Sequence, residues 1–129
     1  MKVMIVLLIG IVIGAFCAMA ATNAMGKRNA HGRAVMVTLT RHLDALRAID
    51  LKTDCRNDQV RTHLDQIAAA SRDIDYAFAA NYAGEPAFAR RSAHFRSLSE
   101  AALGSSCDTL PSAVGELADD CQRCHRQFR

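Results

Sequence analysis

Residues 110–129 of the chain read LPSAVGELADDCQRCHRQFR and carry the clearest helical pattern in the sequence. Apolar side chains recur in this stretch every three or four residues, which is the spacing of one face of an α-helix. That face carries Leu110, Val114, Leu117, Cys121, Cys124 and Phe128. Pro111 fits the first turn of this helix, where a missing backbone N–H costs no hydrogen bond. We therefore expect a final amphipathic helix that buries this face against other helices.

The same periodicity predicts three further helices upstream, over residues 32–50, 59–82 and about 86–103. Their apolar stripes consist of Met36, Leu39, Leu43, Leu46 and Ile49 in the first, Val60, Leu64, Ile67, Ser71, Ile74 and Phe78 in the second, and Phe88, Phe95 and Leu98 in the third. The segments between these helices are too short to cross a bundle. The sequence therefore predicts an all-α fold, an up-down-up-down four-helix bundle.

An apolar segment, residues 3–21, precedes these helices and carries no charged or polar side chain apart from two glycines. Its length of about 19 residues reaches the minimum for a membrane-spanning helix. Ala18-Met19-Ala20 supplies small residues of the kind that signal peptidase cleaves after. A cleaved signal peptide and a retained anchor both remain open, with residues 1–25 as the leader and residues 26–129 as the helical domain.

Composition excludes several classes of protein. The chain has 129 residues and a net charge of +3, which is too small and too scattered for nucleic-acid binding. Tryptophan is absent and β-branched residues are few outside the leader, so a β-sandwich or barrel is disfavoured. No catalytic nucleophile or acid–base pair stands out, and we do not expect an enzyme. Five cysteines in such a short chain are the feature that composition leaves to be explained.

Cys121, Cys124 and His125 form a C-x-x-C-H motif, the attachment signature of c-type haem. Helix positions i and i+3 share a face, so both thiols can reach the two vinyl groups of the porphyrin, and the histidine that follows can ligate the iron. A redox C-x-x-C is expected in a βαβ context, and a zinc site needs a second cysteine pair. The motif predicts one covalent haem c. The structural alternative is a bundle without haem, in which Cys121 and Cys124 form a disulfide.

The chain end resembles the class II c-type cytochromes, the cytochrome c-prime family. These are four-helix bundles with C-x-x-C-H near the C-terminus, typically followed by two residues, an aromatic residue and arginine, and Phe128 and Arg129 match this ending. The resemblance covers the chain from about residue 30, although the specific motif is confined to the last nine residues. It implies one-electron transfer with redox partner proteins, or a five-coordinate haem that binds nitric oxide or carbon monoxide. It also implies a homodimer through the first two helices.

The expected compartment follows from this resemblance and not from the flanking charges. Haem attachment in the family takes place on the periplasmic side of the inner membrane, so the domain is expected in the periplasm. It would be soluble after signal cleavage, or anchored to the inner membrane by residues 3–21. The positive-inside rule alone favours the opposite orientation, because Lys2 precedes the apolar run whereas Lys27, Arg28 and Arg33 follow it. The C-x-x-C-H motif overrides that rule.

The resemblance implies that the first helix supplies the residue on the distal side of the iron. Counting back along this helix leaves Met36 and Val37 as candidates. Helical geometry places Met36 on the stripe that includes Leu39, and Val37 on roughly the opposite side. We therefore expect Met36 as the sixth ligand, which gives a six-coordinate carrier with a raised reduction potential. A methionine at such a position also serves as ordinary core filler.

Other assignments of the distal face and its surroundings remain open. Alignment of Arg33 with the family's first-helix arginine places Val37 at the distal position instead, which would leave the iron open to gases. Met25 and His31 are further candidate ligands. Arg129 and Arg33 are candidate contacts of the haem propionates. We expect the other histidines to be solvated; they are His42, His63 and His94. We expect Arg90 and Arg91 on an exposed face of the third helix.

Two cysteines remain after the leader and the motif are assigned. Cys55 lies in the loop between the first and second helices, and Cys107 in the loop between the third and fourth. In an up-down-up-down bundle these loops lie at the same end, while Cys121 is roughly 20 Å further along a helix. An oxidising compartment favours pairing. The sequence therefore predicts a Cys55–Cys107 disulfide, with two unpaired surface thiols as the alternative.

Overall fold

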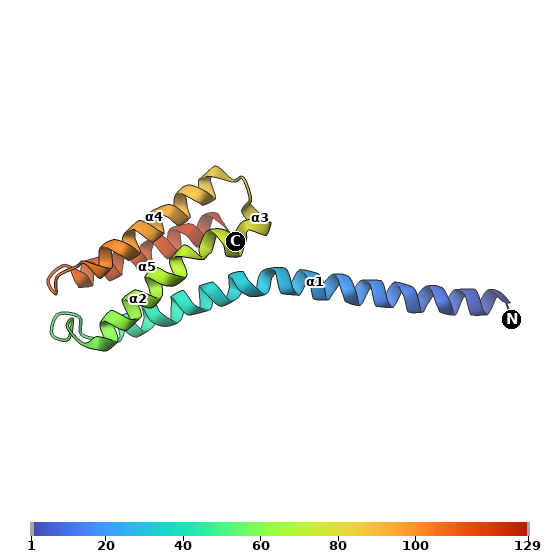
Figure 1. The fold of residues 1–129 in the computed structure, drawn as a ribbon, viewed down its shortest axis with the longest axis horizontal. Coiled ribbons are helices and arrows are strands. Elements are labelled where there is room, and N and C mark those ends of the chain that lie inside the picture. The colour runs from blue at the N-terminus through green and yellow to red at the C-terminus, as the bar shows by residue number, and fades with distance from the viewer. Residues whose placement is uncertain (1, 129) are drawn as a thin grey trace.

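Five α-helices make up the fold in the computed structural model, which describes the backbone of residues 2–128 and the side chains of residues 7, 9–23 and 30–128. The helices are α1 (Lys2–Arg47), α2 (Asp58–Arg72), α3 (Ile74–Tyr82), α4 (Pro86–Leu103) and α5 (Leu110–Gln127), as Figure 1 shows. No strand occurs among the described residues. The all-helical fold class predicted from the sequence is confirmed.

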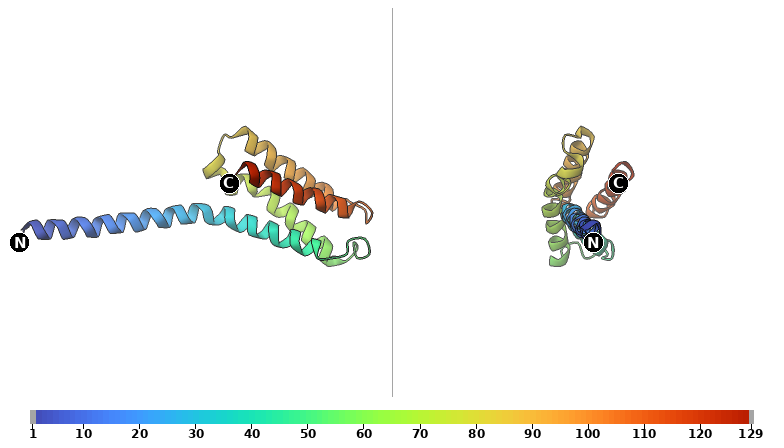
Figure 2. Two further views of the ribbon diagram at one scale, coloured as in Figure 1. Left: turned by 180° about the vertical axis from the view of Figure 1, so that it is seen from behind. Right: turned by 90° about the vertical axis from the view of Figure 1, so that its right-hand side faces the viewer.

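One continuous helix, α1, runs through both the apolar segment and the predicted first helix of the domain. The expected helix start at residue 32 is therefore wrong, and the expected domain boundary after residue 25 falls inside α1. No proline interrupts residues 2–47 and many of them are strong helix formers, so nothing local ends the helix earlier. The N-terminal part of α1 extends beyond the other helices (Figures 1 and 2).

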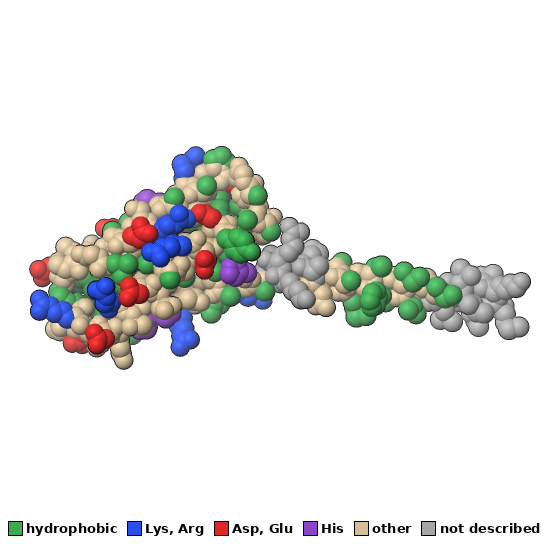
Figure 3. Space-filling view, in the orientation of Figure 1, with side chains coloured by type: hydrophobic (Ala, Val, Ile, Leu, Met, Phe, Trp, Pro, Cys, Tyr) green, Lys and Arg blue, Asp and Glu red, His purple; other side chains and the backbone are tan. Residues whose placement is uncertain are grey.

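Large apolar side chains are exposed along this extension, as Figure 3 shows. They are Leu7, Ile9, Ile11, Val12, Ile13, Phe16 and Met19. Within the described residues, no helix meets the length and mean hydropathy expected of a membrane-crossing segment.

The predicted second helix is divided into two at Asp73. The backbone N–H of Asp73 donates to the carbonyl of Ala70, three residues earlier, at 3.1 Å. Such a tight turn has 3₁₀ geometry, and aspartate is a weak helix former in a helix interior. The third and fourth predicted helices agree with α4 and α5, and a proline occupies the first turn of each.

All five helices contribute side chains to one apolar interior. α1 and α4 each pack against α2, α3 and α5, whereas α1 does not approach α4 within the described residues, and α2 does not approach α5 (Figure 2). Leu46 and Leu117 are fully buried and Ile67 is 1% exposed. Burying such a side chain contributes about 1.5–3 kcal/mol. These residues lie on the stripes that the sequence predicted for the first, second and last helices.

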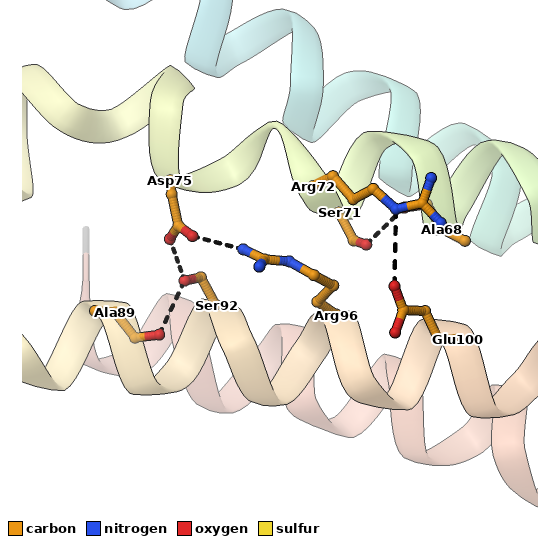
Figure 4. Close-up of polar contacts among 8 residues, drawn as sticks. All are labelled: Ala68, Ser71, Arg72, Asp75, Ala89, Ser92, Arg96 and Glu100. Atoms are coloured by element: carbon orange, nitrogen blue, oxygen red, sulfur yellow. Dashed lines mark hydrogen bonds and ion pairs between the residues drawn. The ribbon is translucent and has the colours of Figure 1, made fainter.

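Polar contacts tie α2 and α3 to α4, as Figure 4 shows. Asp75 accepts hydrogen bonds from Ser92 Oγ and Arg96 Nη2. Arg72 Nε lies 3.7 Å from Glu100 Oε1, and both of these side chains are more than half exposed. Exposed ion pairs contribute roughly 0–1 kcal/mol. The contacts of Asp75 with α4 are therefore expected to stabilise the fold more than the Arg72–Glu100 pair, because Ser92 is buried in the interior.

Cys55 and Cys107 meet at the end of the fold where the α1–α2 and α4–α5 loops lie. Their Cα atoms are 5.3 Å apart, inside the usual range for disulfides, and their sulfur atoms are at bonding distance. The expectation that these two loops share one end is thereby confirmed. Cys17, Cys121 and Cys124 are free thiols in the structure.

We predict that the disulfide contributes about 4 kcal/mol to the free energy of unfolding, because it closes a long loop in the unfolded chain. Replacing both residues, Cys55→Ser and Cys107→Ser, should lower the guanidinium concentration at which half of the chains are unfolded, by an amount that corresponds to this free energy. Alkylation of the unfolded, unreduced chain followed by peptide mass spectrometry should leave both cysteines unmodified. Quantitative labelling of Cys55 and Cys107 would contradict the pairing.

Candidate functional site

A cavity of about 420 Å³ lies between α1, α3, α4 and α5 and is lined by the residues of the C-x-x-C-H motif. Its lining consists of Met36, Leu39, Ile74, Phe78, Asn81, Tyr82, Phe88, Arg91, Ser92, Phe95, Cys121, Cys124, His125 and Phe128. Most of these side chains are apolar or aromatic. Cofactor sites in proteins have this character and a volume of roughly 300–1,000 Å³. The structure thus brings the motif on α5 and the candidate ligand on α1 to one cavity.

The two motif cysteines lie one helical turn apart on α5, where both side chains are half-buried and line the cavity. Burial, together with the nearby charge of Asp120, raises the pKa of the Cys121 thiol to about 11. The same two causes raise the pKa of Cys124. Both thiols are therefore protonated at neutral pH in the haem-free chain. His125 follows directly and lines the same cavity, although it is exposed.

Aromatic rings close the cavity at the end of α5. Tyr82 of α3 stacks on Phe88 of α4, with ring centroids 4.6 Å apart. Phe128 meets both rings edge-on, at 5.4 Å from Tyr82 and 5.3 Å from Phe88. Each such pair is worth about 0.5–1.5 kcal/mol beyond its buried area. Sequence reasoning did not assign Tyr82 to the site, although it lies one turn after Phe78 on the same predicted stripe.

The two distal candidates on α1 have different surroundings. Met36 is half-buried and lines the cavity one turn before Leu39, whereas Val37 is 61% exposed. The α1 residue that faces the cavity is therefore the one that helical geometry placed on the apolar stripe.

The other candidate residues do not line this cavity in the described part of the chain. The side chain of Arg33 is exposed. His31 is also exposed, and its ring packs edge-on against Tyr76 at a centroid distance of 5.6 Å. The side chains of Met25, Lys27 and Arg28, and all of Arg129, lie outside the described residues.

A buried carboxylate stands directly before the first motif cysteine. Asp120 is 1% exposed, and its Oδ1 accepts a hydrogen bond from Arg91 Nη1 at 3.0 Å. His94 Nδ1 lies 3.3 Å from the same oxygen, while Oδ2 has no hydrogen-bond partner among the described residues. A buried charge needs such partners because the loss of hydration is costly. Arg91 lines the cavity and pairs with Asp120, so the cluster links the cavity wall to the buried face of α5.

Sequence reasoning missed this cluster. Arg91 was expected on an exposed face of the third helix, but its side chain is only 29% exposed and pairs with Asp120. A signal was available, because Asp120 lies three residues after Leu117 and four before Cys124, on the buried face of α5. No group of three or more histidine, cysteine, aspartate or glutamate side chains is arranged to hold a metal ion within the described residues.

We predict that Arg91→Met lowers the free energy of unfolding by roughly 2–3 kcal/mol, because it leaves Asp120 buried with its weaker partner only. The partial exposure of Arg91 reduces the loss below that of a fully buried pair. Arg90→Met is the matched control, since Arg90 is an exposed neighbour on α4. Its effect should stay within about 0.5 kcal/mol in guanidinium unfolding. Equal losses in the two variants would contradict a structural role for the Arg91–Asp120 pair.

Comparison with known proteins adds nothing to the site described above. A scan of protein-family models, a search of curated proteins and a search of solved structures each found no match to this chain.

Proposed function

We propose that this chain is a monohaem c-type cytochrome of class II that carries out one-electron transfer. The observation that carries the proposal is an apolar cavity whose lining includes both motif cysteines, the adjacent histidine and Met36. Haem c, when bound, would supply a redox centre that takes up and releases one electron. The chain's own residues would bind it, exclude water and set its potential.

The residues around the cavity fit a covalently held haem. Cys121 and Cys124 are free, share one face of α5 and lie on the cavity wall, so both can form thioethers to one porphyrin edge. His125, directly after them, is the residue for the proximal side of the iron. The aromatic contacts of Phe128 with α3 and α4 would keep water from the bound group.

Met36 is proposed as the distal ligand of the iron. Its side chain lines the cavity from α1, across from the helix that carries the cysteines. A thioether at this position raises the reduction potential of a haem relative to a second histidine, and it favours electron transfer over gas binding. A non-coordinating Met36 would instead leave a five-coordinate iron that binds nitric oxide or carbon monoxide.

The bundle itself is proposed to have up-down-up-down topology. The helix contacts support it, because α1 packs on α2, α2 on α4, α4 on α5 and α5 on α1, while the two diagonal pairs do not approach each other in the described part. Such a ring in chain order, joined by short loops, is the pattern of antiparallel neighbours. A homodimer through the first two helices belongs to the same proposal.

The proposed location is the periplasm. The Cys55–Cys107 pair supports it, because disulfides persist in oxidising compartments. The domain would be free after cleavage of residues 1–25, or anchored to the inner membrane by residues 3–21. Redox partner proteins are the proposed partners in either case.

We predict that the oxidised haem-loaded chain gives a low-spin spectrum with the methionine–iron charge-transfer band. Met36→Ala should abolish this band, convert the ferric spectrum to high spin and let the reduced form bind carbon monoxide rapidly. Val37→Ala is the matched control, because Val37 neighbours Met36 in the chain but is exposed. It should leave the spectrum unchanged. A high-spin spectrum and rapid carbon monoxide binding in the unmodified chain would favour the gas-binding function instead.

A further inference from the structure

A histidine pair joins α1 to α2 outside the cavity described above. His42 Nδ1 and His63 Nδ1 are 2.9 Å apart, with ring centroids separated by 5.1 Å and ring planes inclined at 48°. Both side chains are half-buried. The sequence predicts solvated histidines at these positions, and in the structure the two partly exposed rings contact each other. Neither residue lines the cavity, so the pair is independent of the proposed haem site.

The surroundings of His42 favour its neutral form. Burial lowers the pKa of His42, and the neighbouring His63 and Arg41 lower it further. Two facing nitrogens 2.9 Å apart can share one hydrogen bond only if one ring donates and the other accepts. The accepting nitrogen therefore presents a lone pair, and both Nδ1 atoms present one when the donating ring carries its proton on Nε2 instead.

The separation of the two nitrogens matches a known coordination geometry. Imidazole nitrogens bind first-row metals at about 2.0–2.1 Å, so two ligands at 90° are about 2.9 Å apart and two at the tetrahedral angle about 3.3 Å apart. The hydrogen-bonded distance of 2.9 Å already equals the first of these separations, so the two Nδ1 atoms need not move apart to act as a cis pair in a square-planar arrangement. Square-planar nitrogen coordination is typical of Cu²⁺, which also binds nitrogen ligands most tightly among the divalent first-row ions.

We propose that His42 and His63 form a two-histidine binding site for Cu²⁺ that bridges α1 and α2 through their Nδ1 atoms. Within the described residues no third histidine, cysteine, aspartate or glutamate joins such a group, so water completes the coordination. When the ion binds, the ring that donates through Nδ1 carries its proton on Nε2 instead, so both rings stay neutral and no proton is lost. Because its ligands come from two helices, the ion links α1 to α2 in the folded chain only, and it therefore stabilises the folded state.

The test uses the full chain with its free cysteines blocked so that their thiols do not compete, Cys17 by alkylation and Cys121 and Cys124 by the attached haem or by alkylation. Cu²⁺ is titrated in, with affinity measured by calorimetry and coordination by electron paramagnetic resonance. We expect one ion per chain with hyperfine splitting from two imidazole nitrogens. His42→Gln and His63→Gln should each weaken binding at least about tenfold, as loss of a ligand requires.

The matched control is His94→Gln. This histidine also lies on a helix of the domain, but it contacts Asp120 and not another histidine. Its substitution should leave the copper affinity and the two-nitrogen spectrum unchanged. No copper binding by the unmodified chain, equal loss in all three variants, or an unchanged two-nitrogen signal in the His42→Gln/His63→Gln double variant would each overturn the proposal.

Thermal unfolding gives a second readout that does not depend on the spectrum. Circular dichroism without copper first establishes that each variant is folded. One equivalent of Cu²⁺ should then raise the melting temperature of the unmodified chain and of His94→Gln, and should not raise that of His42→Gln or His63→Gln. A rise of equal size in all of them would show that copper acts elsewhere and would overturn the site.

Discussion

The apolar face of α5 is the constraint on which the rest of the structure depends. Leu110, Val114 and Leu117 on its first turns are buried in the core, and the same face continues into Cys121 and Cys124 at the cavity. A helix has one rotation about its axis, so burying the leucines also fixes where the cysteines point. Packing of α5 into the core therefore also positions the two cysteines, and no separate loop is needed to hold the motif in place.

The two ends of the interior differ, because one carries the disulfide and the other carries the cavity. At one end the α1–α2 and α4–α5 loops are held together by Cys55 and Cys107, next to a core of fully buried residues such as Leu46. Toward the other end the packing opens into the cavity, which aromatic residues of α3, α4 and α5 close. The covalent link thus lies away from the cavity, where it stabilises the bundle without occupying space that a cofactor needs.

Periodicity in the sequence correctly predicted the features that are determined within a single helix. The stripes of α4 and α5, their starting prolines and the orientation of Met36 against Val37 follow from local geometry alone. Contacts between helices were missed, because the rotation of one helix against another is set by packing. The Arg91–Asp120 and His42–His63 pairs are of this kind. The break at Asp73 was missed because one weak helix former seldom stops an otherwise apolar stripe.

If the cavity beside Cys121 and Cys124 holds a covalent haem, the mass of the intact, denatured chain reveals it. The chain is purified from bacterial cells that attach haem c in the periplasm. We expect a mass increased by one haem, with the increment confined to the peptide that contains both cysteines and absent in Cys121→Ala/Cys124→Ala. An unmodified mass, with these two cysteines recovered as thiols or as a disulfide, would contradict it.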